Sequence, residues 1–88
     1  MDINFSSEEE LYKRLLPALR TKQTELKRTG YKNINEKDIY DYLKINKWKK
    51  SRNLTLYEMV DQILNTENLL IDAYIKHKKL YYREEIHE

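Results

Sequence analysis

The stretch SSEEELYKRLLPALRTKQTELKRTG, residues 6–30, predicts one long helix. Ser7 and Glu10 form a capping-box pattern at its start, and Gly30 suits the left-handed residue that ends many helices. Pro17 removes a backbone donor and crowds the preceding turn, so we expect the helix to kink or restart there. The apolar positions follow the spacing of one helix face: Leu11, Leu15, Leu19 and Leu26.

Three more helices are predicted after this stretch. One spans about 36–47 behind an Asn35 cap, and the next opens at Thr55 with Glu58 as its capping partner. The polar residues 65–68 predict a break before a last helix of about 67–83. We therefore expect an all-α fold: a small single domain of three to four short helices over 1–88, helix-turn-helix-like or an orthogonal bundle. Residues 1–6 read as a lead-in, and 84–88 are expected to fray.

The core is expected to contain Leu11, Leu15, Leu19, Leu26, Ile39, Leu43, Trp48, Leu56, Val60, Ile63 and Leu70. Leu64 is also expected to face inward from the third helix. The apolar side of the fourth helix is outlined by Leu69, Leu70, Ala73, Tyr74, Leu80 and Tyr81.

The residues that most chemistry requires are scarce. The chain has no cysteine, hence no disulfide, thiolate metal site or cysteine nucleophile, and its one glycine rules out a phosphate-cradling loop. His77 and His87 lack the i, i+4 spacing of a metal pair. We expect no enzyme, cofactor, metal site or small-molecule substrate.

The sequence also shows no pattern typical of a targeting signal or a membrane helix. The N-terminus is acidic and polar, unlike a signal peptide. No apolar run approaches the roughly 20 residues of a membrane helix. We expect a soluble, cytoplasmic protein with no membrane insertion.

Charge is arranged in blocks along the chain. The total is +2, but residues 11–32 sum to +6, 44–53 to +5 and 76–83 to +4, with acidic stretches between them. Basic blocks that share one face favour nucleic-acid binding. Dispersed blocks, each neutralised by a neighbouring acidic stretch, favour a protein adaptor or plain solubility.

The segment KINKWKKSRN, residues 44–53, holds five cations and no acid around the only tryptophan. Accessible cations bind phosphates, and an exposed ring stacks on unpaired bases. A lone tryptophan in a small helical domain is more often a core anchor, and we assign that structural role to Trp48 together with Leu43. The candidate nucleic-acid contacts are Lys44, Lys47, Lys49, Lys50 and Arg52, joined by Arg20, Lys27 and Arg28.

The first helix and the tyrosines leave a second interpretation open. The cations of the first helix, Lys22 among them, also fit the solvated face of an amphipathic helix. Eight tyrosines are many for this length, and amphipathic rings are favoured at protein interfaces. The alternative to RNA contact is therefore a protein–protein adaptor, acting as a homodimer or on a coiled-coil scaffold.

Several short motifs, in order, resemble one family. They are the L-P-A-L of residues 16–19 with Lys22, the G-Y of 30–31, the Y-L-K of 42–44, the K-W-K-K of 47–50 and the I-L of 63–64. Together they resemble the post-transcriptional regulators of Gram-positive bacteria, the ComN-like proteins, over roughly residues 11–64. The resemblance implies a small non-enzymatic factor that acts on the messenger RNA of a competence operon. It also implies a protein partner at the cell-division site or poles. It supplies no RNA-contacting residue.

Overall fold

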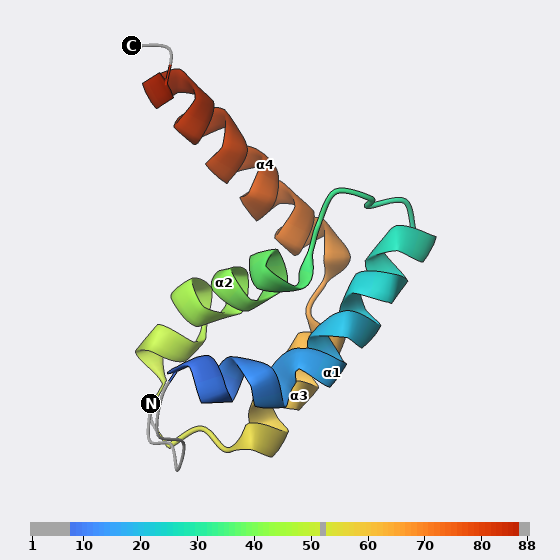
Figure 1. The fold of residues 1–88 in the computed structure, drawn as a ribbon, viewed down its shortest axis with the longest axis vertical. Helices are drawn as coiled ribbons and strands as arrows, with labels where there is room; N and C mark the ends of the chain where they lie inside the picture. Colours follow the sequence, from blue (N-terminus) through green and yellow to red (C-terminus); the bar gives the residue numbers. More distant parts are fainter. Residues whose placement is uncertain (1–7, 52, 87–88) are drawn as a thin grey trace.

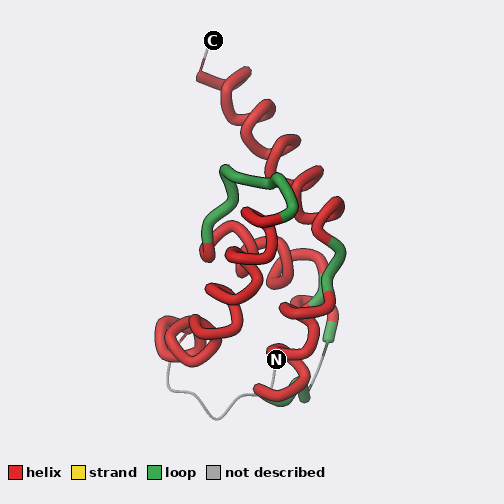
Figure 2. Tube along the Cα trace, turned by 90° about the vertical axis from the view of Figure 1, so that its right-hand side faces the viewer, coloured by secondary structure: helices red, strands yellow, loops and turns green. Residues whose placement is uncertain are grey.

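Four α-helices and one short 3-10 helix make up the part of the chain that the computed structural model describes. That part is residues 8–51 and 53–86, with side chains as far as Lys78. The elements are α1 (Glu8–Arg28), α2 (Glu36–Asn46), η1 (Trp48–Lys50), α3 (Leu56–Asn65) and α4 (Asn68–Ile86). Figure 2 shows these described residues as helices joined by loops, without a strand. The expected all-α fold is confirmed.

Helix α1 is continuous across Pro17. Figure 1 shows its ribbon changing direction between the dark-blue start and the light-blue second half, as a proline inside a helix predicts. Its end is closed by Gly30, whose φ of 104° is left-handed, while the Tyr31 N–H donates to the Leu26 carbonyl over 2.8 Å. Ser7, expected to cap the start, lies outside the described residues.

Local capping sets the starts of α2 and α3. The Asn35 side chain accepts from the Asp38 N–H at 2.9 Å, and Thr55 Oγ1 accepts from the Glu58 N–H at 3.1 Å. Each cap is a reciprocal capping box, as the sequence predicts for Thr55 and Glu58. The expected break also holds, because α3 ends at Asn65 and α4 begins at Asn68.

The core lies where α1 packs against α2 and α3. The expected leucines of α1 are buried, as are Ile39, Leu43, Trp48 and Ile63. Leu56 and Val60 are only half-buried and pack against the edge of the core. The core also includes Ile34, Tyr40, Tyr42 and Met59, together with Ile71 and Ile75 of α4.

The expected inward face of α4 is wrong for Leu69, Leu70 and Ala73, whereas Tyr74 packs against the core as expected. Leu69 and Leu70 are 66% and 46% exposed, Ala73 is exposed, and Leu64 at the end of α3 is 40% exposed. The buried face is instead formed by Ile71 and Ile75, one helical turn apart, with half-buried Tyr74 beside them. Leu80 and Tyr81 lie outside the described side chains. Ile71, Tyr74 and Ile75 follow helical spacing too, so periodicity alone does not select this face over the one that carries Leu69 and Leu70.

Only the first turns of α4 pack against the other helices, and this gives the molecule its elongated shape. Figure 1 shows these turns beside the α1–α2 loop and the start of α2, while the rest of α4 extends away from the other helices. The rings of Tyr42 and Tyr74 meet edge-on, with centroids 5.4 Å apart, where α4 crosses α2. The molecule measures 41 × 32 × 19 Å along its principal axes.

Candidate nucleic-acid interface

The tryptophan of the basic segment is part of the core. Trp48 is 2% exposed, and its indole N–H donates to Gln62 Oε1 at 2.6 Å. Its ring also meets Tyr40 edge-on, with centroids 5.8 Å apart. A ring held in this way cannot stack on a base, so it fixes η1 against α2 and α3.

Three lysines surround this anchored tryptophan and point to solvent. We call Lys47, Lys49 and Lys50 the basic turn. All three are exposed, and none forms an ion pair within the part of the chain that the structure describes. Because Trp48 holds the backbone of η1, the basic turn presents its charges from a fixed position. Arg52, the next candidate, lies outside the described residues.

Lys44, another candidate contact, is ion-paired with Glu8. Its ammonium donates to Glu8 Oε2, an ion pair between α2 and the start of α1, and lies 6.0 Å from the centre of the Tyr40 ring. The Tyr40 hydroxyl donates to the same Glu8 oxygen at 3.2 Å. Lys44 therefore ties α2 to α1, and its charge is already partly neutralised.

The remaining candidates do not join the basic turn. Arg20 lies 3.7 Å from Glu36 in an ion pair between α1 and α2. Lys27 and Arg28 are exposed on the last turn of α1, which Figure 1 places at the far end of the fold from η1. Of the three candidates in the first block, Arg20 is therefore ion-paired, and Lys27 and Arg28 lie away from the basic turn.

Lys22 is the cation that the sequence pattern misplaces. It is 1% exposed, on the same face of α1 as the buried leucines, and not on the solvated face. Its ammonium donates to the carbonyl of Thr66 at 2.5 Å, and lies 3.4 Å from both the Leu64 carbonyl and Glu25 Oε2. Its position, three residues after Leu19 and four before Leu26, is the signal that places it on the core face.

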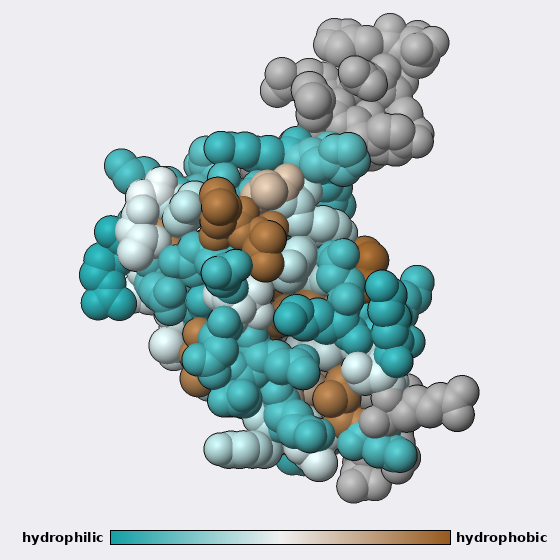
Figure 3. Space-filling model, turned by 180° about the vertical axis from the view of Figure 1, so that it is seen from behind, coloured by the Kyte–Doolittle hydropathy of each residue, from teal (hydrophilic) through white to brown (hydrophobic). Residues whose placement is uncertain are grey.

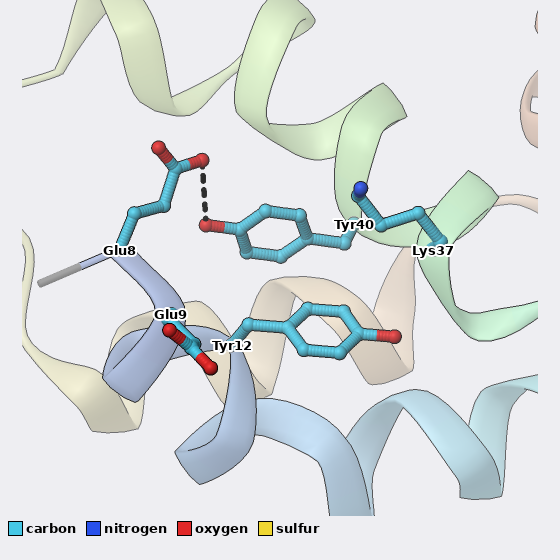
Figure 4. A pocket seen from close by; sticks show the side chains of 5 residues that line it. All are labelled: Glu8, Glu9, Tyr12, Lys37 and Tyr40. Atoms are coloured by element: carbon cyan, nitrogen blue, oxygen red, sulfur yellow. Dashed lines mark hydrogen bonds between the residues drawn. The ribbon is translucent and has the colours of Figure 1, made fainter.

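A small pocket opens where α1 begins beside α2, with a cavity of about 320 Å³ lined by Glu8, Glu9, Tyr12, Lys37 and Tyr40. Figure 4 shows the two tyrosine rings side by side, and their centroids lie 5.1 Å apart at an angle of 85°.

The charged and polar groups of this pocket hold α1 and α2 together. The hydrogen bond from Lys44 holds the pKa of Glu8 below its usual range, against the opposing effect of burial. Burial, reinforced by the Glu8 carboxylate, raises the pKa of Tyr40, and burial also raises that of Tyr12. Tyr40 thus stays a hydrogen-bond donor and Glu8 an acceptor at neutral pH. Both groups are held in their ordinary charge states.

The described residues contain neither a metal-binding cluster nor a membrane-spanning helix. No group of three or more histidine, cysteine, aspartate or glutamate side chains there is placed to hold a metal ion. His77 is exposed on α4, and His87 lies outside the described part. None of the described helices is long and apolar enough to cross a membrane.

Comparison with known proteins adds the family. The family model described as "Post-transcriptional regulator" matches residues 8–83. The chain is also 36% identical over 59 residues to the post-transcriptional regulator ComN of Bacillus subtilis (strain 168). That alignment covers 66% of this chain and 60% of the relative, so the chain spans under two thirds of the relative's length. No solved structure matches. The family match takes in α1, α2, α3 and most of α4, and the chain belongs to the post-transcriptional regulator family.

Proposed function

We propose that this chain is a non-enzymatic post-transcriptional regulator that contacts messenger RNA through the basic turn. The observation that carries the proposal is which of the candidate cations form ion pairs and which do not. Lys47, Lys49 and Lys50 are exposed without an ion pair among the described residues, whereas Arg20 and Lys44 are each paired with a glutamate. The name of the family supports regulation after transcription and suggests a protein without catalysis.

Phosphate contact fits the geometry of the basic turn. Lysine binds phosphate as a point charge, and each phosphate that it neutralises releases condensed counterions. The buried Trp48 supplies no base stacking, so the contact would be mainly electrostatic and weakly dependent on base sequence. Arg52 belongs to the same segment of sequence and is proposed as a fourth contact. Lys44 would contribute only after leaving Glu8.

Fluorescence anisotropy with a labelled leader RNA tests this directly, at several salt concentrations. Wild-type affinity should fall steeply as salt rises. The triple variant Lys47→Glu, Lys49→Glu, Lys50→Glu should lower the slope of log K against log salt concentration by about 2, as expected when three single-strand phosphate contacts are lost.

The matched control is Lys27→Glu, Arg28→Glu, Lys32→Glu. It makes the same change in net charge with three exposed residues at the other end of α1 and in the following loop. The control should keep most of the wild-type slope. Equal losses in the two variants would refute contact at the basic turn. The absence of salt-sensitive RNA binding at micromolar protein would refute direct contact altogether.

The alternative is an adaptor without RNA contact, and the dispersed ion pairs favour it. Beyond those of Arg20 and Lys44, Lys76 lies 3.1 Å from Asp72, and Lys78 lies 3.6 Å from Asp41. Such an adaptor would remain cytoplasmic and be recruited to the division site or poles by a protein partner. Co-purification of that partner after nuclease treatment, with an unchanged yield from the basic-turn variant, would support it.

A further inference from the structure

Three leucines remain exposed at the junction of α3 and α4. Leu64, Leu69 and Leu70 are 40%, 66% and 46% exposed, and we call them the leucine face. Figure 3 shows apolar side chains gathered over the start of α4 on the face of the molecule that it presents. A contiguous apolar surface on a small domain commonly marks a site of interaction.

The leucine face borders a preformed hollow. A hollow of about 450 Å³ is lined by Leu64 and Leu69, by the residues of the junction between them, and by Lys22 and Glu25. The Lys22 ammonium holds the Thr66 and Leu64 carbonyls, and Asn68 Nδ2 donates to Thr29 Oγ1 at 3.2 Å. The junction is thus tied to α1 from two sides, and little ordering is needed before a partner binds.

The segment of sequence that contains the leucine face has only acidic charges. Residues 53–75 contain Glu58, Asp61, Glu67 and Asp72 but no lysine, arginine or histidine. Among the described residues, only Asp72 of these four is paired with a cation, Lys76. The one cation that lines the hollow, Lys22, is buried and faces Glu25. Glu67, which lines the hollow, and Asp61, one turn before Leu64 on α3, therefore have no cation partner among the described residues.

We propose that the leucine face docks a basic amphipathic helix from a partner protein. Apolar residues spaced along one side of such a helix would cover the three leucines, and its lysines or arginines would meet Asp61 and Glu67. RNA is disfavoured on this face because its phosphates would meet uncompensated acids. A symmetric second copy is disfavoured too, because a two-fold interface sets the same acids against each other. The inference goes beyond RNA contact and uses another face of the fold.

The test is a binding titration with a synthetic probe: a labelled peptide of about 18 residues, five helical turns, with leucine on one side and lysine on the other. A peptide with glutamate at every lysine position and a scrambled leucine–lysine peptide serve as references. Wild type should bind the patterned lysine peptide roughly tenfold tighter than either reference.

Matched variants locate the site. Leu69→Ser with Leu70→Ser should weaken the peptide roughly tenfold, whereas Ile45→Ser, equally exposed as Leu70 but on α2, should not. Glu67→Lys should weaken it, and Glu9→Lys, the same charge change on α1, should not. The basic-turn variant should bind the peptide as wild type does, so failure of RNA contact and failure of docking are separable. Circular dichroism confirms that each variant is folded.

Four outcomes would overturn the proposal. The first is no binding of the patterned lysine peptide at micromolar protein. The second is equal binding of the glutamate or scrambled peptide. The third is self-association that the Leu69/Leu70 variant abolishes in sedimentation, which would assign the face to a second copy. The fourth is a loss of RNA affinity in that variant, which would assign the face to nucleic acid.

Discussion

The Lys22 ammonium lies 2.5 Å from the carbonyl oxygen of Thr66, and this contact joins the middle of α1 to the junction of α3 and α4. The last carbonyls of a helix lack partners within the helix and carry the negative end of its dipole. A buried lysine supplies both a donor and a compensating charge there. The direction in which α4 leaves α3 therefore depends on a residue of α1.

Replacing Lys22 with methionine should lower the free energy of unfolding by about 2–4 kcal/mol, because buried carbonyl oxygens lose their donor and Glu25 loses its cation. Urea denaturation followed by circular dichroism measures the loss. Lys27→Met is the control, since Lys27 is exposed on the same helix and should stay within about 0.5 kcal/mol of wild type. A Lys22 variant as stable as the Lys27 variant would contradict the capping role.

Leu43→Ala should destabilise the fold by about 2–5 kcal/mol, because the side chain is fully buried on α2 and its removal leaves a cavity. Ile45→Ala, on the same helix but 46% exposed, should cost much less. Melting curves of the two variants give the comparison. A Leu43 variant that melts within error of wild type would refute the packing of α2.

Local rules were enough to predict much of the helical frame. The Thr55–Glu58 capping box, the Gly30 terminator and the break before Asn68 each depend on residues within a few positions of one another. Such interactions form in the same way whatever the rest of the chain does. The leucine stripe of α1 was equally predictable, because it repeats over several turns.

Contacts between distant residues were not predictable in the same way. Lys22 meets carbonyls more than forty positions away, and a lysine on an apolar face looks like an irregularity until those carbonyls are seen. In α4, two adjacent apolar faces compete, one with Leu69 and Leu70 and one with Ile71 and Ile75. Only the geometry of the junction selects between them.

The candidate site, too, was predictable in part: the positions of its cations were, and their ion pairs were not. The sequence indicated which segments are rich in cations. Ion pairs between helices decide which of those cations remain available to bind phosphate. Glu8 engages Lys44 across 36 positions, and Glu36 engages Arg20 across the α1–α2 contact. The lysines of the basic turn keep no such partner among the described residues. Pairing at that distance leaves no local pattern in the sequence.

Trp48→Phe should cost about 1–3 kcal/mol, because it removes the indole donor to Gln62 and part of the buried ring. RNA affinity measured where the variant is still folded should stay at the wild-type value, since the indole is buried. Adding RNA to wild type should likewise leave tryptophan emission unquenched. Strong quenching, or a loss of affinity in the folded variant, would show that the ring contacts bases.

The Glu8 ion pair predicts a contribution to stability that acid removes. The folded state lowers the pKa of Glu8, so its contribution is present above the ordinary value of 4.5 and is lost as pH falls below it. Because Glu8 is largely exposed, we expect at most about 1 kcal/mol. Glu8→Gln should lower the melting temperature at pH 7 and leave it nearly unchanged at pH 3. Glu9→Gln, next to it but without a hydrogen bond or ion pair to Lys44, is the control and should leave the melting temperature at pH 7 near that of wild type.

Tyr40 predicts the opposite behaviour in alkali. Burial first, and then the Glu8 carboxylate, raise its pKa, so its contribution is complete below the ordinary value of 10.0 and is lost as pH rises above it. Wild type should therefore lose stability above pH 10.0, where the unfolded chain releases the phenol proton and the folded chain keeps it. Tyr40→Phe should flatten this decline while Tyr57→Phe, at a 79% exposed position, should not. Equal alkaline slopes for wild type and Tyr40→Phe would mean that the buried phenol does not control unfolding in alkali.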